Sequence, residues 1–532
     1  MKRLALSRRK VLKNIFPVLF LLFALIGAGP LWSQAAAQQE TAVAAGTTDT
    51  TETTETAEPV ETPPPSLTPA EIEKIEAFIR DQMRKAKIPG LAVAIVKEGR
   101  TVYSNGFGFA DLKKKAPVTP ATLFEMGSAT KFFTGLAILD MEEKGLIKLD
   151  DPVEKYFPWL KMKYRGQEVS MTLRHLLHQS TGLQYYETLA AIPPSTADDA
   201  LEKAVHTLVG KELSMAPGEG YNYTSVAYDV LGLIIQQVSG QPYEEYIKQH
   251  LFKPLQLDNT YLFREEAGEK GMATGYKICF GKPAAYDAPM YRGNTPSAYG
   301  ITNVEDMARW LKIQMGTIEY TGISKEVIEK SHLPAPDLNS PNYAAGWNVF
   351  PHQNIITHGG LNPNYASSIL FGGDKIGVAL LANIGAMPTN GIGHGIMAIL
   401  RGMEPQVAGY DRSTQYDNLS SKLFMILSIL LVLNLVLLII SIIKIIKGKK
   451  RFCLCGTGRI ITLIIATLLF LVLIYVITII PQLLGVNVPL GFGLVWMPCS
   501  FGLAILWLFL TGLFLYLFVL SFVLFRKRNQ GN

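Results

Sequence analysis

Hydrophobic positions are distributed unevenly along the chain, with unbroken apolar runs at its two ends and shorter periodic patterns between them. At the N-terminus, residues 14–32 are almost wholly apolar, follow six basic residues and precede Ala35–Ala37. A basic start, an apolar middle and a small-residue exit are typical of a secretory signal, which we assign to residues 1–37. An uncleaved anchor and, from SRRKVLK at 7–13, a twin-arginine export signal are the alternatives.

Three further apolar runs follow near the C-terminus, at 423–443, 460–480 and 502–525. Each is long enough to cross about 30 Å of hydrocarbon as a helix. Six basic and no acidic residues separate the first two runs, three basic residues follow the last, and residues 481–500 carry no charge. Because basic flanks stay inside, we expect three transmembrane helices in the cell membrane, with everything before them on the extracytoplasmic (periplasmic or extracellular) face.

The region between the apolar ends begins with a polar tether. Residues 38–66 are rich in Thr, Glu and Pro and are predicted to be a disordered linker, because they hold too few large apolar residues to form a core. Order is expected from Thr68, where Thr-Pro-Ala-Glu forms a capping-box pattern before a helix with apolar residues at helical spacing. Residues 91–108 are predicted to form two strands around a Lys-Glu-Gly turn.

Strand-like patterns return only at the far end of this region, at 343–350, 366–372 and 376–383, followed by a helical stretch near 387–403. Helical and irregular patterns dominate from 125 to 330. The order predicts an α/β (α+β) domain over 67–405, with one antiparallel sheet made from both of its ends and an inserted helical subdomain. Residues 406–422 are assigned to a juxtamembrane linker.

Charge and cysteine content narrow the possible functions. The net charge is +6, but the three membrane-flanking segments hold fifteen basic and no acidic residues, which leaves −9 for the rest. An acidic exterior region excludes nucleic acid as the expected partner. Of the four cysteines only Cys279 lies in that region, so no disulfide is expected there; Cys453 and Cys455 are candidates for acylation. The eight histidines show no zinc-protease spacing, so we expect no metal and no cofactor.

The pattern Ser-x-x-Lys occurs three times, at Ser7–Lys10, Ser128–Lys131 and Ser441–Lys444. The first copy lies in the export signal and the third at the end of a predicted membrane helix. The second is predicted to begin an amphipathic helix, whose N-terminal N–H groups favour developing negative charge. Lys131, one turn further on, can accept the serine proton. The alternative is a serine N-cap followed by a solvated lysine.

Two later segments add candidate chemistry. Tyr223 precedes an apolar helix, and a phenol beside an ammonium is expected to have a lowered pKa and to relay protons. His358-Gly359-Gly360 begins a predicted strand, where glycines let a substrate approach and an edge strand can bind an amide. Taken separately, Tyr223 is equally compatible with a core aromatic and His358 with a turn histidine.

Taken in order, Ser128–Lys131, Tyr223–Ser225 and His358–Gly360 resemble the three motifs of the serine β-lactamase and penicillin-binding-protein superfamily. The resemblance is strongest to the class C-like branch with its D-aminopeptidases and esterases. It extends over residues 67–403 and includes IPGLAVAIVKEGRTVY at 88–103. It implies a β-lactamase/transpeptidase-like fold and a serine hydrolase that forms an acyl-enzyme on Ser128.

The same resemblance implies a role for each motif residue. Lys131 and Tyr223 would move the serine proton, and the backbone N–H groups of Ser128 and Leu361 would form the oxyanion hole. His358 stands where β-lactamases commonly have lysine. The resemblance also implies a set of substrate-binding residues: Ser225, His358, Gly359, Gly360 and Asn362, with Asn364 as an alternative to Asn362.

One motif departs from the family pattern, because Tyr-x-Asn is replaced here by Tyr223-Thr-Ser225. The missing carboxamide makes β-lactam hydrolysis a less favoured expectation. An exported class C-like domain followed by three membrane helices resembles the colibactin-maturation peptidases, which remove an N-acyl-D-asparagine cap. We therefore expect a membrane-anchored peptidase acting on a small peptide-like or acyl-D-amino-acid substrate; a D,D-carboxypeptidase, an esterase and a β-lactam or muropeptide sensor are the alternatives.

Overall fold

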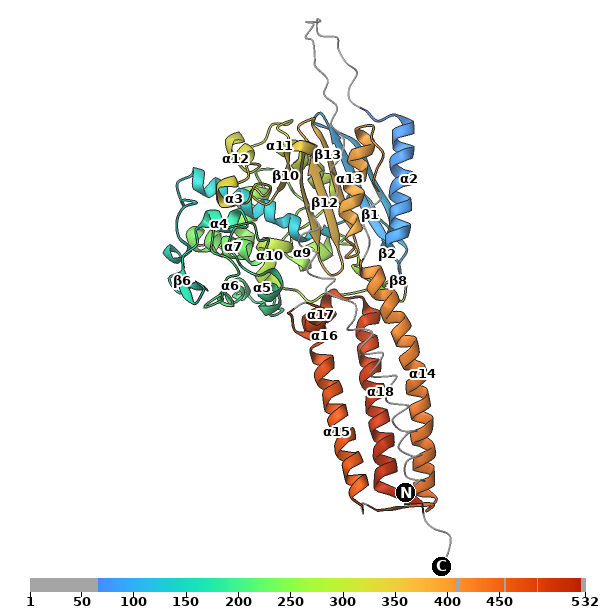
Figure 1. Ribbon diagram of the computed structural model, residues 1–532. Coiled ribbons are helices and arrows are strands. Elements are labelled where there is room, and N and C mark those ends of the chain that lie inside the picture. The colour runs from blue at the N-terminus through green and yellow to red at the C-terminus, as the bar shows by residue number, and fades with distance from the viewer. Residues whose placement is uncertain (1–65, 407–411, 454–455, 486, 528–532) are drawn as a thin grey trace, which may run out of the picture. The chain divides into compact units, whose positions relative to one another are not determined.

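A computed structural model of the 532-residue chain describes residues 66–406, 412–453, 456–485 and 487–527 (Figure 1). The predicted secretory signal and nearly all of the predicted linker lie outside these residues. The chain divides into two compact units. The larger contains residues up to 427 together with 494–506, and the smaller contains 428–493 and 507–527. Each unit is described by itself.

A seven-stranded antiparallel sheet forms the centre of the larger unit (Figure 1). Its strands, in spatial order, are β10 (Asn348–Phe350), β11 (Ile355–Leu361), β12 (Ala366–Phe371), β13 (Ile376–Ala382), β1 (Gly90–Lys97), β2 (Arg100–Asp111) and β3 (Ala116–Pro117). Ala94 of β1 lies opposite Ser104 of β2 and Ala379 of β13. The two ends of the domain therefore meet in one sheet, and the predicted architecture is confirmed.

Helices cover both faces of this sheet, so β12 and β13 are buried throughout. Helices α2 (Pro69–Ala86) and α13 (Pro388–Leu400) pack against one face (Figure 1). Helix α2 begins at the predicted capping box: the Thr68 hydroxyl accepts from the Glu71 N–H at 3.2 Å, and the Glu71 carboxylate accepts from the Thr68 N–H at 2.8 Å. Helix α11 (Val304–Gln314) packs against β1 and β13 on the other face.

The segment between β3 and β10 is mainly helical, as predicted, with short strand pairs. Its other helices are α3 (Lys131–Glu143), α4 (Leu173–Leu177), α5 (Tyr185–Ala191), α6 (Ala200–His206), α7 (Val226–Ser239), α8 (Tyr243–Ile247), α9 (Arg264–Glu269), α10 (Thr295–Ala298) and α12 (Lys325–Lys330). The paired strands are β4 (Phe124–Glu125) with β9 (Ile301–Thr302), β5 (Met162–Tyr164) with β6 (Gln167–Val169), and β7 (Tyr276–Cys279) with β8 (Lys282–Ala285).

Helix α3 was predicted to be amphipathic, but every residue from Lys131 to Met141 is buried. Phe132 stacks between Trp310 and Trp347, with ring centroids 5.0 Å and 4.6 Å away. A helix surrounded by protein on all sides has no solvent-exposed face. Its polar side chains therefore contact other protein groups instead of water.

A disulfide joins Cys279, at the end of β7, to Cys499, the first residue of helix α18 (Cys499–Leu524). The expectation that Cys279 would have no partner was wrong, since it considered only the sequence before the membrane runs, and the partner follows 220 residues later. The Asp417 carboxylate reinforces the junction: it accepts from the N–H groups of Phe280 and Gly281 at 2.9 and 2.6 Å and from the Ser500 hydroxyl at 2.6 Å. All these residues belong to the larger unit.

The predicted membrane runs correspond to three helices that are long and apolar enough to span a membrane: α14 (Arg412–Ile446), α15 (Thr457–Thr478) and α18. Residues 412–422, assigned to the juxtamembrane linker, form the first turns of α14 instead. Two short helices, α16 (Ile480–Leu483) and α17 (Leu490–Trp496), and the paired strands β14 (Lys450–Phe452) and β15 (Phe525–Lys527) complete this part. The Ser441 hydroxyl contacts Ser521 at 2.7 Å, so this serine joins α14 to α18.

We predict that Cys279→Ser destabilises the larger unit, because the disulfide restricts the unfolded chain and holds the β7–β8 hairpin. The loss is about 2–4 kcal/mol in the free energy of unfolding, seen as a lower thermal midpoint of the purified chain in detergent micelles. Cys453→Ser is the control, since Cys453 is outside the disulfide. Equal midpoints for Cys279→Ser and the unchanged protein would contradict this prediction.

Candidate active site

Ser128 lies in a 3₁₀ turn, Gly127–Thr130, that continues directly into α3. Every other residue from Thr122 to Met141 is buried, whereas Ser128 is partly exposed. The serine hydroxyl is therefore presented at the start of a buried helix, as the sequence predicts. This position leaves Ser128 accessible to a substrate while its backbone is held by the core.

The Lys131 ammonium lies beside this hydroxyl. Its Nζ is 3.2 Å from Ser128 Oγ, 3.3 Å from Ser225 Oγ and 2.8 Å from the Ser297 carbonyl oxygen. Lys131 has no exposed surface. Burial lowers the pKa of Lys131, because a charged ammonium loses its hydration there, while the negative charge of Asp229 opposes that shift. Lys131 is thus suited to receive a proton from Ser128.

Asp229 is a residue of this site that the sequence analysis missed. It is fully buried on α7, and its carboxylate accepts a hydrogen bond from Asn294 Nδ2 at 2.6 Å. Burial raises the pKa of Asp229. A signal was present in the sequence, because an aspartate in the apolar run VAYDVLGLII has to find a partner inside the protein.

Tyr223 stands in the loop before α7. The expectation of a lowered pKa was wrong: burial raises the pKa of Tyr223 well above its usual value, the neighbouring Tyr185 adds to the shift, and the Ser128 side chain acts to lower it. Lys131 Nζ lies over the face of the Tyr223 ring, 5.0 Å from its centroid. Tyr223 therefore remains a protonated phenol near neutral pH.

His358 lies on β11 and is 2% exposed. Its Nδ1 is 2.5 Å from the Gly346 carbonyl oxygen. Because a carbonyl only accepts, Nδ1 carries the hydrogen and Nε2 remains an acceptor. Burial, followed by repulsion from Lys131, lowers the pKa of His358 to about 3. The imidazole is thus neutral, unlike the lysine that commonly stands here in β-lactamases.

The turn that carries Ser128 is in direct contact with the end of β11. Gly127 has φ = +56°, and a Cβ there would lie 2.5 Å from the Leu361 nitrogen. A Cβ on Gly360 would collide with the Met126 carbonyl oxygen, which already accepts from Ser367 Oγ at 2.6 Å. Only glycines permit this approach. The backbone nitrogens of Ser128 and Leu361 are thereby brought near each other, as an oxyanion hole requires.

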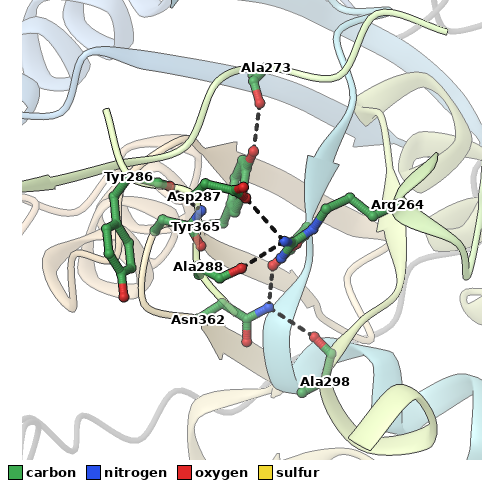
Figure 2. Close-up of polar contacts among 10 residues, drawn as sticks. Arg264, Ala273, Tyr286, Asp287, Ala288, Ala298, Asn362 and Tyr365 are labelled. Atoms are coloured by element: carbon green, nitrogen blue, oxygen red, sulfur yellow. Dashed lines mark hydrogen bonds and ion pairs between the residues drawn. The ribbon is translucent and has the colours of Figure 1, made fainter. Parts of the chain in front are cut away.

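The residues expected to bind substrate fall into two groups. Gly359 keeps accessible surface on β11, as does Leu361 of the expected oxyanion hole, whereas His358 and Gly360 are buried. Ser225 is 4% exposed, with Lys131 on its hydroxyl. Asn362 is 2% exposed and its amide nitrogen donates to the Glu125 carboxylate and to the Ala298 carbonyl oxygen (Figure 2). The Asn362 side-chain nitrogen is therefore occupied by protein.

The Asn364 side chain is likewise engaged, since its Nδ2 donates to the Tyr286 carbonyl oxygen at 2.9 Å. The geometry brings together Ser128, Lys131, Tyr223, Ser225 and His358 from three separate segments of the sequence. Across the described ranges, no three His, Cys, Asp or Glu side chains converge as metal ligands would. What the cluster can do chemically is transfer a proton from a serine to an amine.

A family model described as Beta-lactamase matches residues 75–394. The chain belongs to the beta-lactamase family. This member is 33% identical to Protein flp of Staphylococcus aureus strain MW2 over 323 residues, which are 60% of this chain and 64% of flp. It is 33% identical to Beta-lactamase of Escherichia coli K12 over 251 residues, which are 46% of this chain and 61% of that protein. The chain thus matches less than two thirds of the length of these relatives.

Solved structures give the same assignment for this beta-lactamase-family domain. The octameric penicillin-binding protein homologue from Pyrococcus abyssi superposes with a TM-score of 0.56 and 33% identity, covering 63% of this chain and 79% of that one. FmtA from Staphylococcus aureus superposes with a TM-score of 0.53 and 23% identity over 63% of this chain and 90% of its own, a likeness of fold alone. Membership in the class C-like branch stays a prediction.

We predict that Asp229→Asn moves the acid limb of the pH profile of kcat/KM to lower pH. The Asp229 charge raises the pKa of Lys131, so removing it lowers that pKa and frees the amine at lower pH, a shift of up to about one unit. The other groups facing the ammonium are the hydroxyls of Ser128 and Ser225, the Ser297 carbonyl oxygen, the rings of Tyr223 and Tyr228, and His358.

The control for this prediction is Asp140→Asn, which neutralises another buried carboxylate, one paired with Lys144 instead of acting on Lys131. It should leave the acid limb where it is. An acid limb that stays fixed or moves to higher pH in Asp229→Asn would show that Asp229 does not govern Lys131.

Proposed function

We propose that this chain is a membrane-anchored serine hydrolase that cleaves amide bonds through an acyl-enzyme on Ser128. The observation that carries the proposal is the placement of Lys131 Nζ 3.2 Å from Ser128 Oγ in a buried site that lowers its pKa. A neutral amine at that distance is a competent general base. A merely structural lysine would gain nothing from losing its hydration next to a partly exposed serine.

In the proposed reaction, neutral Lys131 takes the proton from Ser128 Oγ as that oxygen attacks the substrate carbonyl. The resulting oxyanion accepts from the backbone N–H groups of Ser128 and Leu361, and each such donor typically contributes about 3–4 kcal/mol. Tyr223, whose raised pKa keeps it protonated, donates its proton to the leaving nitrogen and regains one from Lys131. Water then adds to the acyl-enzyme and loses a proton to Lys131. When the adduct collapses, Ser128 Oγ leaves and takes that proton from Lys131, which restores the serine hydroxyl and the neutral amine.

We propose a substrate with a D-residue next to the scissile amide, of the acyl-D-asparagine or cell-wall peptide type. Support comes from the middle motif, where Ser225 replaces the carboxamide that usually contacts a substrate amide. Its hydroxyl is engaged by Lys131. Neutral His358 offers an acceptor in place of a cation, which suits an uncharged group better than a carboxylate.

We further propose that the catalytic domain faces the extracytoplasmic side. Disulfides persist in oxidising compartments, and the Cys279–Cys499 bond is formed between the β7–β8 hairpin of the domain and the first residue of α18. Both cysteines must therefore lie on the same, oxidising side. The basic residues flanking the other ends of the helices independently favour the cytoplasm for those ends.

We predict that the full chain in detergent micelles releases the reporter amine from an acyl-D-asparagine amide and that Ser128→Ala abolishes this release. The L-asparagine amide, an ester and a penicillin serve as comparison substrates. Equal rates for the D and L amides would contradict the stereochemical preference. Stable labelling of Ser128 by penicillin, with no turnover of any amide, would overturn the hydrolase in favour of a sensor.

We predict that a membrane-impermeant maleimide leaves Cys453 unlabelled in intact cells and labels it after permeabilisation, because the segment between α14 and α15 is assigned to the cytoplasm. After reduction of intact cells, Cys279 and Cys499 should become reactive from outside. Mass spectrometry of tryptic peptides identifies each site. Labelling of Cys453 in intact cells would reverse the topology.

A further inference from the structure

A buried carboxylate lies directly behind the Ser128 turn. Glu125, the last residue of β4, is 1% exposed and stands three residues before Ser128. Arg264, at the start of α9, donates to Glu125 Oε1 from Nε at 2.9 Å and from Nη2 at 2.5 Å. Asn362 Nδ2 donates to the other oxygen, Oε2, at 2.6 Å. Figure 2 shows the Arg264 and Asn362 side chains pointing toward each other from different segments.

The Glu125 carboxylate is therefore a bridge, with one oxygen for each partner. Its buried charge is compensated mainly by Arg264, since an unpaired carboxylate would be costly there. Arg264 also donates through Nη1 to the Ala288 carbonyl oxygen at 2.8 Å and lies 3.5 Å from Asp287, whose side chain is fully exposed. The exposed Asp287 contact is weak by comparison, because solvent screens it.

This bridge joins the two chain segments that carry the oxyanion N–H groups. Glu125 precedes Met126 and Gly127 on the Ser128 side, and Asn362 directly follows Leu361 on the β11 side. The Ser367–Met126 hydrogen bond fastens the same two parts of the fold from the strand side. Since Ser128 and Leu361 are far apart in sequence, their separation depends on such cross-links, and a small displacement weakens the stabilisation of an oxyanion.

We propose that Glu125, Arg264 and Asn362 form a positioning bracket that sets the distance between the Ser128 and Leu361 N–H groups. This rests on the proposed hydrolase function. It assigns to Asn362 a positioning role in place of the substrate contact expected from the sequence. None of the three side chains touches the reacting atoms; each acts through the backbone of its neighbour.

The test is Glu125→Gln, which keeps the shape of the side chain but replaces one acceptor oxygen by a donor. Because an oxyanion exists only in the transition state, kcat should fall about tenfold to a hundredfold while KM stays within about twofold. The affinity for phenylboronic acid, which forms a tetrahedral adduct on Ser128, should fall in parallel. Asp287→Asn is the matched control: it alters the exposed partner of the same arginine and should change neither quantity.

The double variant Glu125→Gln/Asn362→Asp distinguishes positioning from general stability. It restores the hydrogen bond with donor and acceptor exchanged, so kcat and boronate affinity should recover in part relative to Glu125→Gln. If Glu125→Gln does not fold, kcat and boronate affinity are measured in Arg264→Lys. This variant keeps the positive charge but loses the two guanidinium N–H groups that donate together to Glu125. All assays are run well below each variant's thermal midpoint.

Two results would overturn the bracket: an unchanged kcat in a folded Glu125→Gln or Arg264→Lys chain, or a loss confined to thermal stability with boronate affinity intact. Failure of the proposed function itself has a different signature. In that case the unchanged protein turns over no amide or ester and forms no boronate adduct on Ser128, whatever residue stands at position 125.

Discussion

The burial of the Lys131 ammonium is the constraint on which the rest of the site depends. A lysine without solvent must find its hydrogen-bond partners inside the protein, and here Ser128, Ser225 and the Ser297 carbonyl provide them. Those partners come from the Ser128 turn, the start of α7 and α10. The requirement of one side chain thus fixes three otherwise separate segments around the serine. It also explains why α3 is enclosed on all sides.

The glycine contacts and the Glu125 bridge answer a second requirement, that two N–H groups distant in sequence face one oxygen. Gly127 and Gly360 permit the backbones to approach, while hydrogen bonds from Asn362 and Ser367 hold them. Without the hydrogen bonds, the serine turn and β11 could shift relative to each other. Without the two glycines, the backbones could not come close enough for those hydrogen bonds to form. The serine turn and β11 therefore act as one structural unit.

Much of the fold followed from local pattern. The capping box at Thr68, the paired strands at both ends of the domain and the three apolar runs depend on short-range periodicity, which is visible in one sequence. The Ser128–Lys131 spacing likewise needs only one helical turn. The partner of Cys279, the bridge from Glu125 to Asn362 and the contact of Asp229 with Asn294 depend on residues brought together by folding. The Tyr223 pKa was misjudged for the same reason, because its direction depends on how deeply folding buries the ring and on Tyr185 beside it.

The Cys279–Cys499 bond closes a covalent loop that contains β10 to β13, α14 and α15. A protease that cuts between a domain and the helices that follow it ordinarily separates the two. In this chain a single backbone cut between α13 and α14 leaves the sheet attached to α18 through sulfur. Shedding of the domain therefore requires both a cut and a reductant, and a soluble fragment that appears without reduction must have lost this bond beforehand.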